Sequence, residues 1–314
     1  MDASVRTSLA GIDLATPVLL AAGTAGTLAE MAGVVDLSRV GGVVTKSITR
    51  RPRDGNETWR IIESKAGMLN AIGLANPGAE AFERDVAPLA AGLPTKVIGS
   101  VAGFTIDDYV HVAGMMDGVD AIEAVELNVS CPNVDHANAE FGADPRALGE
   151  LVRAVRPALE RTKLFVKLSP VAIGTPATIV DIAGAAIEAG ADGLCISNTV
   201  PAMGIDVRTR RPKLANVTGG LSGPAVHAIA VRLVHLVHRE VARDAGVPIV
   251  GIGGVLRWDD AAEFILAGAT AVQVGTGLFV DPRSPVKIAK GLAKWCANQG
   301  VASINELVGA VEAG

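Results

Sequence analysis

The chain has 314 residues, of which 49% are hydrophobic and 19% charged, so it holds enough apolar material for a substantial core. A net charge of −5 at pH 7 argues against a dedicated nucleic-acid-binding protein, which normally presents a basic face. The three cysteines form neither a disulfide framework nor a pattern of metal ligands, and no leader or apolar run of membrane-spanning length is evident. We therefore expect a cytoplasmic protein that uses no metal and binds neither nucleic acid nor membrane.

Apolar runs alternate with helical patterns along the whole chain. Residues 4–14 are expected to form strands that start with a small hairpin. Buried strands are predicted over residues 18–22, 42–46, 96–100, 124–129, 164–168, 193–197, 248–251 and 271–275. Helices are predicted up to about residue 40, over 78–91, 106–116, 145–161, 176–189, 224–243 and 258–267, and at the end of the chain. Eight such units indicate an α/β protein, a (β/α)8 TIM barrel with one domain over residues 1–314.

Two segments between these elements, residues 50–77 and 200–222, are too long for simple connections. Long loops in compact domains are more often functional than structural. We expect both segments to form active-site loops.

Small and polar residues gather where the predicted strands end. In a TIM barrel these carboxyl ends meet at one mouth, which carries the active site. The residues are Gly23, Lys46, Ser100, Asn128 with Cys131, Lys167, Asn198, Gly253 with Gly254, and Gly275 with Thr276. Although they are far apart in the sequence, the barrel would bring them to a single site.

Residues 124–136 are the most informative stretch. Pro132 biases Cys131 away from helical geometry, so the thiol is expected on an extended segment just after a strand. Asn128 and Asn133 flank it with amides that can bind a planar, amide-rich ligand. A lone cysteine is weak evidence, and from these residues alone a catalytic and a structural role have equal weight.

Two further features point to an anionic ligand. Glycine-rich turns at Gly223, Gly253–Gly254 and Gly275–Thr276 offer backbone amides beside helix starts, an arrangement that binds phosphate. Lys46 and Lys167 lie at or inside apolar strands, where a lysine needs a partner. A bound anionic cofactor is the natural candidate for that partner.

With these features the chain resembles the class 1 dihydroorotate dehydrogenases. The matching segments span nearly the whole chain in family order: residues 45–47, 67–77, 126–133, 166–170, 198–199, 216–224, 251–254 and 272–276. The form of residues 67–74, and a cysteine rather than a serine at position 131, resemble the class 1B catalytic subunit.

The resemblance implies FMN at the mouth of the barrel and oxidation of (S)-dihydroorotate to orotate in de novo pyrimidine (UMP) synthesis. It makes Cys131 the base that removes the C5 proton, and residues 132–143 a loop that closes over the substrate. The implied substrate-binding residues are Lys46, Asn70, Ala71, Ile72, Gly73, Leu74, Asn128, Asn133, Asn198 and Thr199. The implied FMN-binding residues are Ala22, Gly23, Lys46, Ser47, Ser100, Asn128, Lys167, Ser197, Gly223, Gly253, Gly254, Gly275 and Thr276.

Two residues depart from the family pattern. Ser100 stands where many relatives have asparagine, and Ser197 stands where an aliphatic residue is more familiar. Each change can alter a contact to flavin or substrate, but neither affects Cys131 or the lysines.

The class 1B resemblance also implies partners. Such enzymes pass electrons to NAD⁺ through a separate iron–sulfur and FAD subunit, and this chain has neither a four-cysteine cluster motif nor a dinucleotide fingerprint. We therefore expect a homodimer flanked by two partner subunits, a heterotetramer.

Three other interpretations remain open. One is a class 1A-type enzyme that uses fumarate, and another is a dihydropyrimidine dehydrogenase-like flavin enzyme. The third is a non-catalytic flavin-binding barrel that serves as an interaction subunit. The asparagine set favours a carboxylated ligand, and Cys131, Lys46 and Lys167 together argue against a binder without chemistry.

Overall fold

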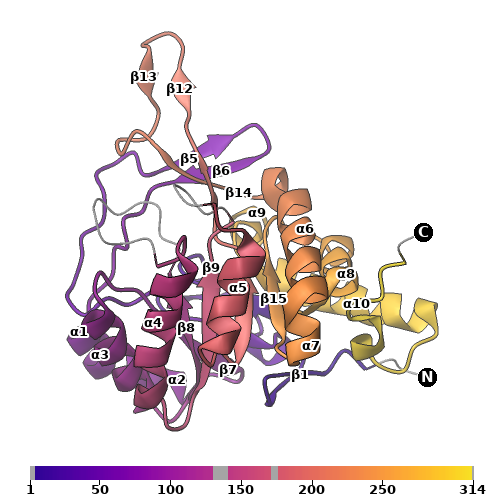
Figure 1. Cartoon of the computed structure of the whole chain (residues 1–314). Helices are drawn as coiled ribbons and strands as arrows, with labels where there is room; N and C mark the ends of the chain where they lie inside the picture. The colour runs from indigo at the N-terminus through magenta and orange to yellow at the C-terminus, as the bar shows by residue number, and fades with distance from the viewer. Residues whose placement is uncertain (1–3, 130–140, 171–175, 313–314) are drawn as a thin grey trace.

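Eight parallel strands close into a barrel in the computed structural model, which describes residues 4–129, 141–170 and 176–312 (Figure 1). In barrel order the strands are β3 (Val18–Leu20), β4 (Gly42–Val44), β7 (Lys96–Val101), β8 (Ile122–Asn128), β9 (Lys163–Leu168), β10 (Gly193–Ile196), β15 (Ile249–Ile252) and β16 (Ala269–Val274). The strands follow one another in chain order, and β16 pairs with β3 to complete the ring. This confirms the predicted (β/α)8 barrel.

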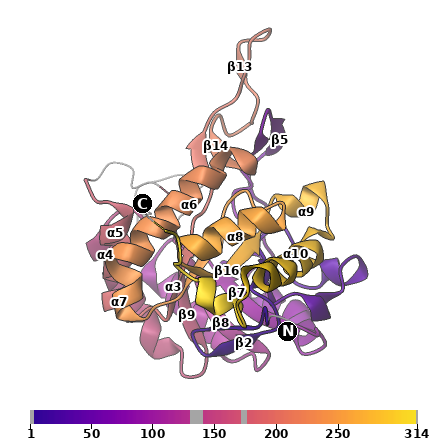
Figure 2. The ribbon, with the colours of Figure 1, turned by 90° about the vertical axis from the view of Figure 1, so that its right-hand side faces the viewer.

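Helices surround the barrel (Figures 1 and 2). The α-helices are α1 (Ala79–Ala81), α2 (Ala87–Ala90), α3 (Ile106–Asp117), α4 (Pro145–Val155), α5 (Ile179–Glu188), α6 (His227–Val237), α7 (Arg243–Ala245), α8 (Trp258–Ala267), α9 (Gly277–Val280) and α10 (Ser284–Gln299). Shorter 3-10 or π turns extend them at η3 (Phe82–Val86), η4 (Arg156–Ala158), η5 (Pro224–Val226) and η6 (His238–Ala242), and a separate 3-10 turn, η7 (Ile304–Leu307), follows α10. Within the described ranges, no helix has the length and apolar character needed to cross a bilayer.

The starts of α4 and α5 follow directly from the sequence. The Asp144 carboxylate accepts a hydrogen bond from the Arg146 amide at 2.8 Å, just ahead of Pro145 at the first helical position. At α5, Thr178 and Asp181 form a reciprocal capping box.

The helix predicted up to residue 40 is wrong. The structure has only two short 3-10 turns there, η1 (Glu30–Gly33) and η2 (Leu37–Arg39). The Asp36 backbone is extended, and its carboxylate accepts from the Ser38 amide at 3.2 Å, which starts a new turn. Gly33, a poor helix former, also falls inside the predicted helix, so the segment divides in two.

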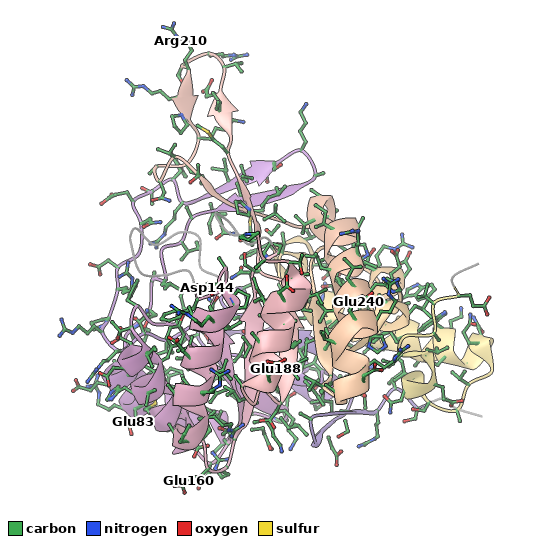
Figure 3. The ribbon with its side chains drawn as sticks, viewed as in Figure 1. Glu83, Asp144, Glu160, Glu188, Arg210 and Glu240 are labelled. Carbon is green, nitrogen blue, oxygen red and sulfur yellow. The ribbon has the colours of Figure 1, made fainter. Side chains whose placement is uncertain are left out.

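The two segments predicted as loops contain strands. A four-stranded antiparallel sheet, ordered β11–β14–β6–β5, joins β5 (Ile61–Ser64) and β6 (Gly67–Asn70) to β11 (Val200–Ala202) and β14 (Gly219–Ser222). A hairpin of β12 (Ile205–Asp206) and β13 (Arg211–Pro212) projects beyond it, with Arg210 at its tip and Glu160 at the opposite end of the molecule (Figure 3).

The sheet was not predicted from the sequence because its strands contain glycine. A Cβ at Gly220 would collide with the Thr199 hydroxyl, and one at Gly67 would collide with the Ser222 carbonyl oxygen. These glycines therefore permit close strand approach, whereas glycine in a sequence usually signals a turn.

The hairpin predicted near the start of the chain is present, and it covers the other end of the barrel. It consists of β1 (Thr7–Leu9) and β2 (Ile12–Leu14), whose apolar side chains Leu9, Ile12 and Leu14 pack in one cluster with inward-facing barrel residues. Figure 2 places β2 at the end of the molecule opposite β13 and β14. The hairpin thus completes the core below the barrel.

We predict that Leu14→Ala lowers the free energy of unfolding by about 2–5 kcal/mol, because it removes a buried side chain that packs under the barrel. Urea denaturation followed by circular dichroism measures the loss. The matched control is Ser8→Ala at the exposed position of β1, which should change stability by no more than about 0.5 kcal/mol. A loss for Leu14→Ala as small as that of the control would contradict the role assigned to the hairpin.

Candidate functional site

A cavity opens at the carboxyl ends of the barrel strands, below the antiparallel sheet. Most residues expected at the site line it: Ala22, Gly23, Lys46, Ser47, Asn70, Ile72, Gly73, Leu74, Asn128, Lys167, Ser197, Asn198, Thr199, Gly223, Gly253, Gly254, Gly275 and Thr276. The structure therefore brings together residues from the first to the last barrel strand.

Two expected residues that the structure describes, Ala71 and Ser100, do not line it. Ala71 is buried in a small cluster with Leu69 and Leu214, because alternation along the chain turns its side chain away from the cavity. Ser100 is fully buried beneath Ser47, which does line the cavity and whose hydroxyl contacts that of Ser100. Cys131 and Asn133 lie outside the described residues, as does most of the predicted loop over residues 132–143.

Hydroxyl and amide groups form a continuous chain across the cavity floor. The Ser47 and Ser100 hydroxyls lie 2.9 Å apart, and Asn128 Nδ2 donates to Ser47 Oγ at 3.1 Å. Asn198 Nδ2 in turn donates to Asn128 Oδ1 at 3.2 Å, and the Thr199 amide donates to Asn198 Oδ1 at 2.8 Å. These bonds fix the orientation of both asparagine side chains.

Ser100 is part of this hydrogen-bond chain, although it does not line the cavity. Its backbone amide donates to Thr45 Oγ1 at 2.9 Å and its hydroxyl meets Ser47, so Ser100 supports a cavity residue from below. Ser197 Oγ donates to the Asn198 carbonyl oxygen at 3.1 Å, which is a local contact.

Lys46 presents a partly buried ammonium to the cavity. Burial lowers the pKa of Lys46, the positive charge of Arg60 lowers it further, and the Glu30 carboxylate opposes both effects. Glu30 is itself held by the backbone amides of Thr27 and Leu28, at 2.7 and 2.9 Å. Because burial disfavours the charged ammonium, an anionic ligand bound beside Lys46 would stabilise that charge.

The three glycine-rich turns meet in one cradle. Gly254 has a φ of +66°, and a Cβ there would come within 2.8 Å of His227 Cβ and 2.9 Å of the Gly223 carbonyl oxygen. Thr276 Oγ1 donates to Ser222 Oγ at 2.8 Å, which ties the third turn to the first. His227 Nδ1 lies 2.9 Å from the Gly253 carbonyl oxygen and holds the second turn against α6. Backbone turns of this kind beside helix starts suit a phosphate group.

A charged cluster lies beneath the cavity floor, and sequence interpretation missed two of its members. The Lys167 ammonium lies 3.6 Å from Glu126 Oε1, and Gln273 Nε2 donates to Glu126 Oε2 at 2.8 Å. All three residues are buried. Alternation could have revealed Glu126, since it precedes Asn128 by two positions in an apolar strand and therefore shares its face.

Other cavity residues were missed because they come from segments interpreted as loops or turns. They include Thr24, Met68 and Ser222. Met68 and Ser222 are directly opposite each other in the antiparallel pair of β6 and β14, which no local pattern predicts. Within the part of the chain that the structure describes, no cluster of three or more His, Cys, Asp or Glu side chains could hold a metal ion.

Comparison with known proteins gives one consistent result. The family model for dihydroorotate dehydrogenase matches residues 4–295. Proteins named dihydroorotate dehydrogenase B (NAD(+)), catalytic subunit, are similar over almost the entire chain. The one from Trichlorobacter lovleyi is 45% identical, covering 99% of this chain and 100% of its own length. The one from Desulforudis audaxviator is 47% identical, covering 99% and 98%.

The resemblance noted above implies FMN as the ligand of this cradle. If FMN binds there, we predict that Gly254→Ala weakens its binding at least tenfold, because the added Cβ pushes the His227 and Gly223 sides of the cradle apart. The measurement is quenching of FMN fluorescence as apoprotein is added.

Gly246→Ala is the matched control. Gly246 has nearly the same φ, +67°, but a Cβ there would meet nothing within 4 Å, and the residue does not line the cavity. It should share the cost of backbone strain, about 1–3 kcal/mol of stability, without loss of FMN affinity. Equal affinities in the two variants would show that the cradle does not bind the phosphate.

Proposed function

The chain belongs to the dihydroorotate dehydrogenase family, and we propose that it oxidises (S)-dihydroorotate to orotate in de novo pyrimidine synthesis with FMN as its cofactor. The observation that carries the proposal is the cavity itself. It combines a phosphate cradle, a buried lysine and an oriented pair of asparagines at one barrel mouth.

The residues present fit FMN. The glycine turns at Gly223, Gly253–Gly254 and Gly275–Thr276 would hold its phosphate, and Lys167 would place a positive charge beside the ring system. Ser47, supported by Ser100, would bind the ring from the opposite part of the floor. FMN, when bound, supplies the acceptor for the hydride that leaves C6 of dihydroorotate.

Amide groups would orient the substrate. Asn128 and Asn198 are held in place by their mutual hydrogen bond, and Asn70 and Thr199 complete the set in the cavity wall. Asn133 would add a further amide. Lys46, whose pKa burial lowers, gains a partner when the substrate carboxylate binds next to it. The sheet above the mouth would keep water away from these contacts.

Cys131 would act as the base. Its thiolate takes the proton from C5 while the hydride leaves C6, so two hydrogens are lost and a carbon–carbon double bond forms. In the sequence, Cys131 follows Asn128, the last residue of β8, by three positions. A thiol suits this role when its pKa lies near the working pH.

Electrons would leave through a separate protein. The relatives named above are called NAD(+) enzymes and catalytic subunits, and this chain carries no four-cysteine motif. We propose that the partner is an iron–sulfur and FAD subunit, and that a homodimer of this chain binds two copies of it.

We predict that dihydroorotate bleaches the flavin absorbance of the purified protein within seconds under anaerobic conditions. Cys131→Ser should slow this reduction about 10²-fold or more, because the hydroxyl is a much weaker base at neutral pH. Stopped-flow absorbance measures both rates. The control is Cys296→Ala, which removes a buried thiol on α10 and should leave the rate unchanged.

The same sample separates the competing functions. A flavin that bleaches with dihydrouracil but not dihydroorotate would indicate a dihydropyrimidine dehydrogenase-like enzyme, and one that bleaches with neither would indicate a binding protein. Once the flavin is reduced, rapid reoxidation by fumarate would contradict the partner-dependent assignment. We expect fumarate and NAD⁺ alone both to be poor acceptors.

A further inference from the structure

The interior of the barrel changes character from bottom to top. Alternation places Phe165 and Lys167 on the inner face of β9, and Ala124, Glu126 and Asn128 on that of β8. The lower residues, Phe165 and Ala124, belong to the apolar cluster with the β1–β2 hairpin. One step nearer the mouth, the apolar layer gives way to charged and amide side chains.

Glu126 lies beneath the site and does not face it. The residue has no exposed surface and does not line the cavity, whereas Lys167 lines the cavity and keeps 8% of its side chain exposed. The carboxylate is therefore in contact with the lysine from the side away from the ligand. A substrate or cofactor in the cavity meets the ammonium of Lys167 and not the Glu126 carboxylate.

The two carboxylate oxygens are held differently. Oε2 accepts a hydrogen bond from Gln273 Nε2, which anchors the carboxylate to β16 on the far side of the barrel interior. Oε1 accepts no hydrogen bond from the described residues and faces the Lys167 ammonium at 3.6 Å. The carboxylate is thus fixed on one side by a neutral donor and interacts with the lysine mainly through charge.

The second side chain in contact with Gln273, that of Cys195, adds no charge. Cys195 Sγ lies 3.8 Å from Gln273 Nε2. Burial raises the pKa of the Cys195 thiol well above its usual value, and the negative charge of Glu126 raises it further, although Lys167 acts in the opposite direction. The thiol stays protonated, so the electrostatics of this cluster reduce to one ammonium and one carboxylate.

We propose that Glu126 is a positioning residue that orients Lys167 and, through its negative charge, sets the reduction potential of the flavin bound above it. The inference rests on the proposed function. A buried carboxylate is costly, and packing alone would be served better by an apolar residue. Lys167 favours a flavin that has gained negative charge, and Glu126 offsets part of that attraction. Glu126 thereby limits how strongly the reduced flavin is stabilised. The reduced flavin can then still pass its electrons on.

The test is the midpoint potential of the bound flavin, measured by anaerobic equilibration with a redox dye. Glu126→Gln keeps the shape and the acceptor for Gln273 but removes the charge. The ratio of reduced to oxidised flavin at a given potential should rise at least tenfold, which is a shift of about 30 mV to more positive values for a two-electron couple. An unchanged or more negative potential would overturn the proposal.

Two further variants separate charge from packing. Gln273→Met removes the hydrogen bond to Glu126 without changing any charge, so the ratio should change less than threefold. An effect as large as that of Glu126→Gln would show that packing is responsible and would overturn the proposal.

Glu126→Asp retains the charge but withdraws it by one methylene, so a smaller positive shift is expected. It decides the question if Glu126→Gln does not retain flavin: an unchanged or more negative potential in Glu126→Asp would then overturn the proposal. The flavin spectrum of the wild-type protein and its bleaching by dihydroorotate test the proposed function separately, because neither result depends on the role of Glu126.

Discussion

Closure of the parallel sheet is the constraint on which the rest of the molecule depends. In an open sheet, each edge strand would leave backbone amides and carbonyls without partners. The pairing of β16 with β3 removes both edges at once. Since all eight strands run in one direction, their carboxyl ends must surround a single opening. Residues as distant in the chain as Gly23 and Thr276 therefore become neighbours around one cavity.

The barrel interior divides its work by depth. Its lower part is apolar and continuous with the β1–β2 hairpin, so it stabilises the fold by burial of hydrophobic surface. Its upper part buries Ser100, Glu126, Lys167 and Gln273, which contribute little through hydrophobic burial and need partners for their polar groups. Those partners are supplied from different strands, which holds the polar layer rigid beneath the ligand.

Periodic patterns in the sequence predicted the barrel and most of its helices, because these features depend on local alternation. The strand ends and glycine-rich turns predicted part of the cavity lining, and the family resemblance supplied the other expected residues, such as Asn70 and Thr199. The covering sheet could not be predicted, since β6 and β14 pair across some 150 residues and need glycine where side chains would collide. Glu126 was missed for another reason. Alternation places Glu126 on the same face of β8 as Asn128, but its partners Lys167 and Gln273 lie on other strands. Which residues of different strands meet is set by register, which the sequence pattern does not give. Ala71 was expected at the site but does not line the cavity, because a motif does not say which side chains of a strand-like run face inward.

The β1–β2 hairpin affects how substrate and product enter and leave the cavity. Because the hairpin and the apolar side chains inside the barrel fill its lower end, ligands reach and leave the cavity from the side of the mouth. A product that has not departed therefore occupies the space that the next substrate needs. Product must therefore leave before the next substrate binds, and in many enzymes this release is the slow step of turnover.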